Sequence, residues 1–126
     1  MEACAECVES RTALAEEFKA LGALFSALGD ENRQRVLATL LVSDQIGMRT
    51  GEIAERAHLS RQAVSRHLRL LREAGAVGVY RQGTRSYYYP APGECWRRLQ
   101  ALSTHICAAV ETAAGAGYPH FEEEEI

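Results

Sequence analysis

Apolar residues recur every three or four positions along five segments of this 126-residue chain, which is the spacing that buries one face of an α-helix. The segments differ in length, and the third is much the shortest. This pattern predicts helices over residues 8–28, from Asp30 to near Ser43, over 51–57, from Ser60 to about Ala74 and over about 93–114.

Polar residues that favour helix ends stand at the boundaries of these segments. Asp30, Thr50 and Ser60 each precede a predicted helix, and their side-chain oxygens can accept a hydrogen bond from a free backbone N–H of the first turn. Gly29 and Gly75 follow the first and fourth segments, where a glycine is suited to ending a helix.

The stretch VGVYRQGTRSYYYP, residues 77–90, has a different pattern. Valines and tyrosines favour strands, and Gln82-Gly83-Thr84 is suited to the tip of a hairpin that Pro90 and Pro92 end. The expected order is therefore helix, helix, short helix, helix, hairpin, helix. This order describes a mainly α fold with a small β-hairpin, a winged helix-turn-helix. In this fold two helices are joined by a tight turn, and the second of them, here the helix from Ser60 to about Ala74, enters the DNA major groove.

The length and composition of the chain fit one compact domain. We expect a winged helix-turn-helix domain for DNA binding and dimerisation over 10–114. A cysteine-containing N-terminal segment at 1–9 should precede it, and an acidic tail at 115–126 should follow it. No apolar run is long enough to span a membrane, and the acidic N-terminus does not resemble a secretory signal. We therefore expect a cytoplasmic protein whose four cysteines are not structural disulfides.

The segment SRQAVSRHLRLL, residues 60–71, combines two rows of side chains. Val64, Leu68 and Leu71 form an apolar row that should face the core. A second row faces another side of the same helix and consists of Arg61, Gln62, Ser65, Arg66 and Arg69. Such side chains hydrogen-bond to base edges and phosphates, so this row is the candidate DNA-reading face.

Charge is segregated along the chain although the net charge is only −3. Residues 49–98 contain ten arginines and four glutamates, whereas the flanking segments are both acidic. A basic middle segment of this kind attracts a polyanion, and a nucleic acid is the natural candidate.

The sequence resembles the ArsR/SmtB family of bacterial repressors. The resemblance lies in three stretches: LFSALGDENRQRVLATL at 24–40, GEIAERAHLSRQAVSRHLRLLREAGAV at 51–77 and RQGTRSYYYP at 81–90. It implies a homodimer that forms through the first and last helices. It also implies binding to double-stranded operator DNA that a chemical signal relieves.

Carried over to this chain, the resemblance assigns DNA contacts to the predicted recognition helix and to the wing. The residues concerned are Ser60, Arg61, Gln62, Ser65, Arg66, Arg69, Arg81 and Arg85. The alternative for each arginine is a place on an ordinary solvated surface.

The resemblance also points to metal sensing, but the family's Cys-x-Cys box is absent. At the corresponding positions this chain has Arg49 and Gly51. The cysteines stand elsewhere, and if the first and last helices pack together they all lie near the dimer interface: Cys4, Cys7, Cys95 and Cys107. Thiolates there would suit As(III), Cd(II) or Zn(II) as a regulatory ligand.

Other interpretations of the cysteines and of the fold stay open. Two thiols could respond to oxidation by forming a disulfide, and Cys107 in HICAAV could simply be a packing residue. A winged-helix module that binds proteins is a further alternative, although the arginine-rich helix argues against it. The sequence contains no nucleotide-binding glycine loop and no convincing catalytic set, so we do not expect an enzyme.

Overall fold

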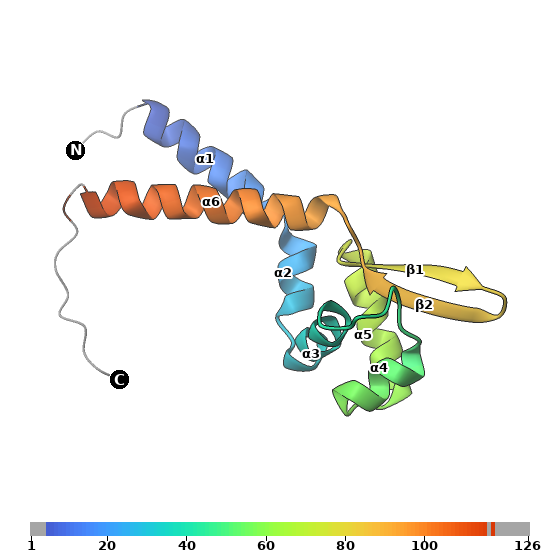
Figure 1. Cartoon of the computed structure of the whole chain (residues 1–126). Helices are drawn as coiled ribbons and strands as arrows, with labels where there is room; N and C mark the ends of the chain where they lie inside the picture. Colours follow the sequence, from blue (N-terminus) through green and yellow to red (C-terminus); the bar gives the residue numbers. More distant parts are fainter. Residues whose placement is uncertain (1–4, 116, 118–126) are drawn as a thin grey trace, which may run out of the picture.

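The chain forms helices and one antiparallel hairpin over the part that the structure describes, which comprises residues 5–115 and 117, with side chains from residue 11 onward. The structure is a computed structural model. Its elements are α1 (Ala5–Ala20), α2 (Gly22–Leu28), α3 (Glu31–Leu41), α4 (Thr50–Ala57), α5 (Arg61–Glu73), β1 (Val77–Gln82), β2 (Arg85–Pro90) and α6 (Glu94–Gly115) (Figure 1). The predicted mainly α fold with a small hairpin is confirmed.

The prediction of a single helix over residues 8–28 is wrong. α1 ends at Ala20, α2 begins at Gly22, and Leu21 between them has non-helical backbone angles. Leu21 is buried, so the break allows α2 to turn into the core while α1 lies along α6. A glycine at the start of α2 also weakens helix continuation. The apolar spacing runs on through the break, and periodicity alone therefore does not reveal it.

Helices α2 to α5 and the hairpin share one apolar core. Val64, Leu68 and Leu71 are fully buried, as the periodicity of α5 predicts. They belong to the same cluster as Val36 of α3 and Ile53 of α4. Truncating a buried leucine of this kind costs about 2–5 kcal/mol. The core therefore fixes which side of α5 faces solvent.

Side-chain caps begin two of the helices at the predicted residues. The Asp30 carboxylate accepts a hydrogen bond from the backbone N–H of Arg33 at 2.9 Å, and the Ser60 hydroxyl accepts one from Ala63 at 3.1 Å. A cap of this type stabilises a helix by about 1 kcal/mol. The predicted starts of α3 and α5 are thus confirmed.

The prediction of Thr50 as the cap of α4 is wrong by one residue. Thr50 is already helical, and the capping position is occupied by Arg49, whose side chain makes no capping hydrogen bond. The cause lies in tertiary structure. Met48 pairs with Tyr88 of β2 through two backbone hydrogen bonds of 2.8 and 2.9 Å. This pairing keeps the chain extended up to Arg49.

The hairpin that follows α5 is confirmed as well. β1 and β2 pair from Val77 opposite Pro90 to Gln82 opposite Arg85. The turn between the strands is therefore Gly83–Thr84, and Gly83 has a φ of +67°, which suits a tight hairpin turn. The hairpin projects from the core as a wing (Figure 1).

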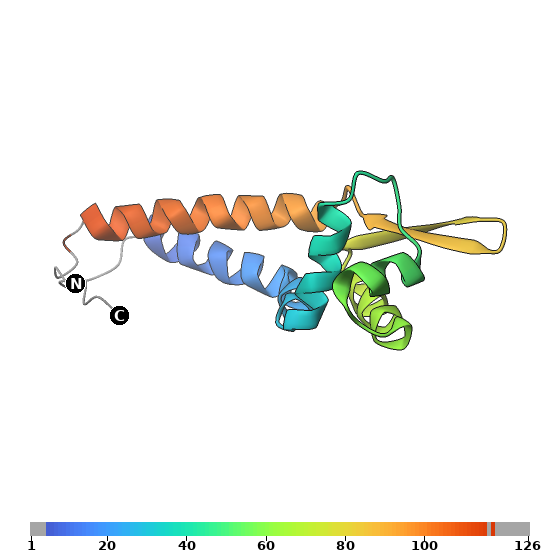
Figure 2. The ribbon, with the colours of Figure 1, turned by 60° about the horizontal axis from the view of Figure 1, so that its bottom comes forward.

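Helices α1 and α6 form an antiparallel arm that extends away from the core (Figures 1 and 2). The start of α1 lies beside the end of α6, and large apolar side chains remain exposed on both helices. Phe18 of α1 is 47% exposed and Val110 of α6 is 55% exposed. Among the described helices, none is long and apolar enough to cross a membrane.

Candidate nucleic-acid interface

The outer face of α5 is polar and accessible along its length. Val64, Leu68 and Leu71 point into the core, and the polar residues on the opposite side of the helix point away from it. The candidate residues of this segment are all exposed: Ser60, Arg61, Gln62, Ser65, Arg66 and Arg69. Arg72 continues the row one turn further on. The described fold therefore presents these side chains on one continuous surface.

The guanidinium of Arg61 has a neighbour that sequence analysis did not identify. It lies against Gly51 in the first turn of α4, where a Cβ on the glycine would stand 3.0 Å from Nη2 and 3.2 Å from Cζ. Contacts this short are tighter than a side chain normally accepts. Nothing in the local sequence TGEI signals this role, because the contact comes from the packing of α5 against α4.

The wing carries the other two candidate residues. Arg81 pairs with Ser86 and Arg85 pairs with Gln82, so both arginines stand near the hairpin turn, and both are exposed. Further back, the Tyr80 ring stacks on Tyr87 with centroids 5.2 Å apart. Stacked rings across a strand pair stabilise the hairpin. The arginines are thus held at the end of a supported wing.

His67 also belongs to α5 but lies on its buried side and is only 4% exposed. Burial lowers the pKa of His67 below its ordinary value of 6.5, and the nearby charge of Asp30 offsets part of this effect. The nearby Arg33 and Arg66 lower it further. Within the described part of the chain, Nδ1 of His67 has no hydrogen-bond partner. Burial therefore favours the neutral form of this imidazole, which packs on the core side of α5.

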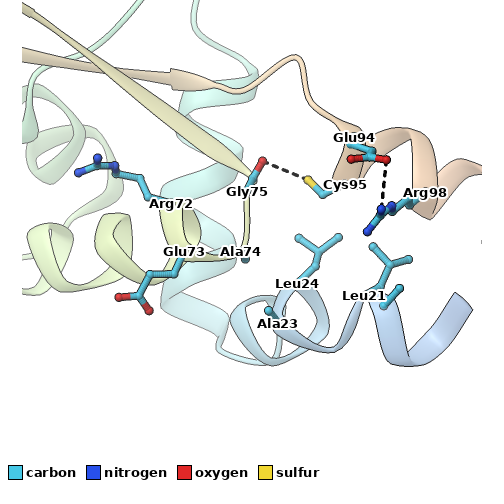
Figure 3. A pocket seen from close by; sticks show the side chains of 11 residues that line it. Leu21, Ala23, Leu24, Arg72, Glu73, Ala74, Gly75, Glu94, Cys95 and Arg98 are labelled. Atoms are coloured by element: carbon cyan, nitrogen blue, oxygen red, sulfur yellow. Dashed lines mark hydrogen bonds and ion pairs between the residues drawn. The ribbon is translucent and has the colours of Figure 1, made fainter. Parts of the chain in front are cut away.

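Cys95 stands beside a cavity of about 290 Å³ between α2, the end of α5 and the start of α6 (Figure 3). Leu21 and Leu24 form part of its wall. The Cys95 thiol donates a hydrogen bond to the carbonyl oxygen of Gly75 at 3.2 Å. Burial raises the pKa of the Cys95 thiol. The thiol proton is thus the donor in the contact with Gly75, and burial disfavours the thiolate form that binds metals.

The other two cysteines within the described helices, Cys7 and Cys107, belong to the arm. Cys107 is exposed on α6, and Cys7 belongs to α1, although its side chain is outside the described residues, as is the whole of Cys4. Both Cys95 and Cys107 are free thiols.

The arm places Cys7 and Cys95 far apart within one chain. Glu17 of α1 lies beside His105 of α6, and the two helices run in opposite directions. Cys7 lies ten residues before Glu17 and Cys95 ten residues before His105, so at 1.5 Å per residue they are about 30 Å apart. Among the described residues no three His, Cys, Asp or Glu side chains come together as a metal site. Cys7 and Cys95 of one chain are therefore too far apart to bind the same ion.

Comparison with known proteins identifies the fold. A sequence model described as a helix-turn-helix domain matches residues 28–79. Over 65 residues the chain is 34% identical to the transcriptional repressor SdpR of Bacillus subtilis, covering 52% of this chain and 69% of the repressor. An ArsR-like transcriptional regulator from Rhodococcus sp. RHA1 superposes with a TM-score of 0.64 at 29% identity, covering 79% of this chain and 90% of that one. The chain belongs to the ArsR family.

As an ArsR-family protein, it is a transcriptional regulator with a DNA-binding helix-turn-helix. Another similar structure, Mb0332 from Mycobacterium bovis, is described as a homodimeric winged helix-turn-helix domain. It has a TM-score of 0.53 and 26% identity, covering 88% of this chain and 94% of that one. HlyU of Vibrio cholerae, 29% identical over 68% of this chain and 77% of its own, is described as an activator. The relatives thus include both a repressor and an activator.

Proposed function

We propose that this ArsR-family regulator binds operator DNA as a homodimer, with α5 in the major groove and the hairpin beside it. The observation that carries the proposal is the division of α5 into a fully buried apolar row and a continuous exposed row of arginine, glutamine and serine. In the helix-turn-helix geometry, the exposed row of the second helix meets the bases.

The DNA contacts are assigned to the exposed residues of the recognition helix and the wing. They comprise Ser60, Arg61, Gln62, Ser65, Arg66 and Arg69 on α5, with Arg81 and Arg85 on the hairpin. Glutamine and arginine hydrogen-bond to adenine and guanine edges, and arginines near the wing tip suit the adjacent minor groove or backbone.

The arm formed by α1 and α6 is the proposed dimer interface. Its two helices contact each other and leave Phe18 and Val110 substantially exposed. Covering such apolar side chains with a second copy would remove them from water, which favours association. The homodimeric Mb0332 structure supports this arrangement.

Repression that a chemical signal relieves is the proposed mode of regulation. The similarity to SdpR, a repressor, supports the direction of control. A thiophilic ion such as As(III), Cd(II) or Zn(II) is the proposed signal, with thiol oxidation as the alternative. Because the two described thiols, Cys95 and Cys107, stand twelve residues apart on one helix, a site that uses both would have to be shared between protomers.

The test is direct binding to duplex DNA. Duplexes of 30 base pairs tiled across the region upstream of the protein's own coding sequence are titrated by fluorescence anisotropy between 50 and 200 mM KCl. We expect at least one duplex to bind about a thousandfold more tightly than a scrambled one, with affinity falling steeply as salt rises. Light scattering should give twice the chain mass of 13.9 kDa. Absence of salt-dependent DNA binding would favour the protein-interaction module instead.

A further inference from the structure

We propose that Arg61 contacts a DNA phosphate rather than a base edge, and that Gly51 is the residue that positions it. This inference rests on the proposed DNA binding. It assigns phosphate contacts and base contacts to different residues of the same interface. Residue type alone suggests a base contact for Arg61, because it is the first residue of the recognition helix. The position of its guanidinium instead favours a phosphate contact.

The guanidinium of Arg61 lies at the first turn of α4. A Cβ on Gly51 would be 3.0 Å from Nη2, 3.2 Å from Cζ and 3.3 Å from Nε, so most of the guanidinium group faces the glycine. The side chain therefore reaches from the start of α5 to the first turn of α4. Gly51 leaves the space that the group occupies.

This location matches the DNA backbone in a helix-turn-helix complex. The first helix of the motif crosses the sugar–phosphate backbone, while the second inserts its outer face into the major groove. α4 is the first helix and α5 the second. A guanidinium at the start of α4 is thus placed beside phosphates. Base edges are left to residues further along the exposed row, namely Gln62, Ser65 and Arg66.

The charge of Arg61 is available for such a contact. The ion pairs within the described residues join Arg98 to Glu94 and His105 to Glu17, and neither involves Arg61. An arginine can bind a phosphate through two parallel N–H···O bonds. Those bonds require a fixed orientation of the guanidinium plane, which packing on Gly51 provides.

Substitution of Gly51 separates this positioning role from a structural one. Because Gly51 is helical, alanine or leucine there should favour the helix and should not lower Tm. The group that must move is the flexible end of Arg61, so the fold is spared. If Gly51 positions Arg61, DNA affinity falls while Tm holds or rises. A merely structural role would leave DNA affinity unchanged.

The experiment measures Kd for the best upstream duplex and for a scrambled duplex, each from 50 to 200 mM KCl. The variants are Arg61→Ala, Gly51→Ala, Gly51→Leu and the double variant Gly51→Leu with Arg61→Ala. The control is Gly22→Leu, since a Cβ at this helical glycine meets nothing within 4 Å. Circular dichroism melting accompanies each variant.

We expect Arg61→Ala to weaken both duplexes by a similar factor, on the order of tenfold, and to reduce the salt slope by about one per protomer. Gly51→Leu should reproduce this loss, Gly51→Ala should show part of it, and the double variant should lose little more than Arg61→Ala. Gly22→Leu should bind normally. Loss confined to the upstream duplex in Arg61→Ala, or unchanged binding in Gly51→Leu, overturns the inference. Failure of the wild-type protein to bind DNA would instead reject the proposed function.

Discussion

The imidazole Nδ1 of His105 on α6 lies 2.7 Å from one carboxylate oxygen of Glu17 on α1 and 2.9 Å from the other. The two residues are 88 positions apart in sequence, and their contact joins the two helices that form the arm. The same two helices carry the proposed dimer interface. Their relative position should therefore affect how two protomers meet.

Glu17→Gln is expected to weaken dimerisation modestly. The pair is partly solvent-exposed, and such pairs contribute about 0.2–1 kcal/mol, so the dimer dissociation constant should rise by at most about fivefold. Sedimentation equilibrium measures this change. His105→Ala in the Glu17→Gln background should add only the loss of the remaining neutral hydrogen bond, because the glutamine amide oxygen can still accept from the imidazole. Fully additive effects of the two substitutions would show that the contact does not contribute to the dimer.

Arg66→Ala is expected to remove sequence discrimination rather than DNA binding as such. Arg66 is exposed on the outer face of α5, and one bidentate base contact is worth about 1–3 kcal/mol of discrimination. Affinity for the best upstream duplex should fall while affinity for a scrambled duplex changes little. Arg97→Ala, an exposed arginine of α6, is the matched control. Equal losses of DNA affinity in the two variants would contradict a base contact by Arg66.

The buried His67 predicts a pH-dependent stability. Its folded-state pKa is lowered by burial, so the unfolded chain takes up the proton more readily than the native protein. Stability from this group is present above pH 6.5, the ordinary value, and is lost as pH falls below it. Urea unfolding between pH 7.5 and 5 should therefore show a fall in the free energy of unfolding.

His67→Gln should flatten that fall, because a neutral side chain takes up no proton. His58→Gln serves as the control, since His58 is exposed in the turn before α5. Asp30, whose pKa is lowered mainly by its hydrogen bond to the Arg33 backbone, acts in the same direction but only below pH 3.8. An unchanged pH profile in His67→Gln would contradict the assignment.

A close approach in the wing gives a further prediction. Gly78 stands opposite Tyr89 in the hairpin, and a Cβ there would lie 2.5 Å from Cζ of the tyrosine ring. Gly78→Ala must therefore displace the ring, and we expect destabilisation of about 1–3 kcal/mol. Chemical denaturation measures the effect.

The control is the double variant Gly78→Ala with Tyr89→Ala. Removing the ring also removes the clash, so the double variant should be more stable than the sum of the single changes predicts. Strict additivity would mean that the ring already has room to move aside.

Local chemistry accounts for what the sequence predicted correctly. The caps at Asp30 and Ser60 and the buried row of α5 depend on residues three or four positions apart, which a sequence displays directly. The break at Leu21 and the start of α4 depend on tertiary packing and on pairing with β2. The periodicity of apolar residues reveals neither the break nor this helix start.

The candidate site divides in the same way. Exposure of the arginine row follows from the helical period, so the sequence identified its members. The packing of the Arg61 guanidinium on Gly51 joins two helices and has no local signal. Cys95 stands at the head of the last helix as expected, whereas its hydrogen bond to Gly75 and the burial that raises its pKa come from tertiary packing and have no local signal.

The two described thiols should therefore differ in reactivity. Cys107 is exposed, whereas Cys95 is partly buried, is bonded to Gly75 and has a raised pKa. Since the thiolate is the reactive form, we expect Cys107 to react with a disulfide reagent at pH 8 about tenfold faster than Cys95 or more. Mass spectrometry of partially labelled protein gives both rates. Equal rates would show that the Gly75 contact opens readily in solution.

The same difference predicts which cysteine matters in a metal titration. Reduced protein is titrated anaerobically with As(III), Cd(II) or Zn(II), while thiolate absorbance and release of the upstream duplex are followed together. If the site takes thiolates from both protomers, saturation should come at one ion for each pair of chains when the site lies on the two-fold axis, and at one ion per chain when two equivalent sites form. Cys107→Ser should abolish the signal and Cys95→Ser should retain it. Loss in Cys95→Ser alone would reverse this assignment, and silence of the wild-type protein toward all three ions would favour thiol oxidation as the signal.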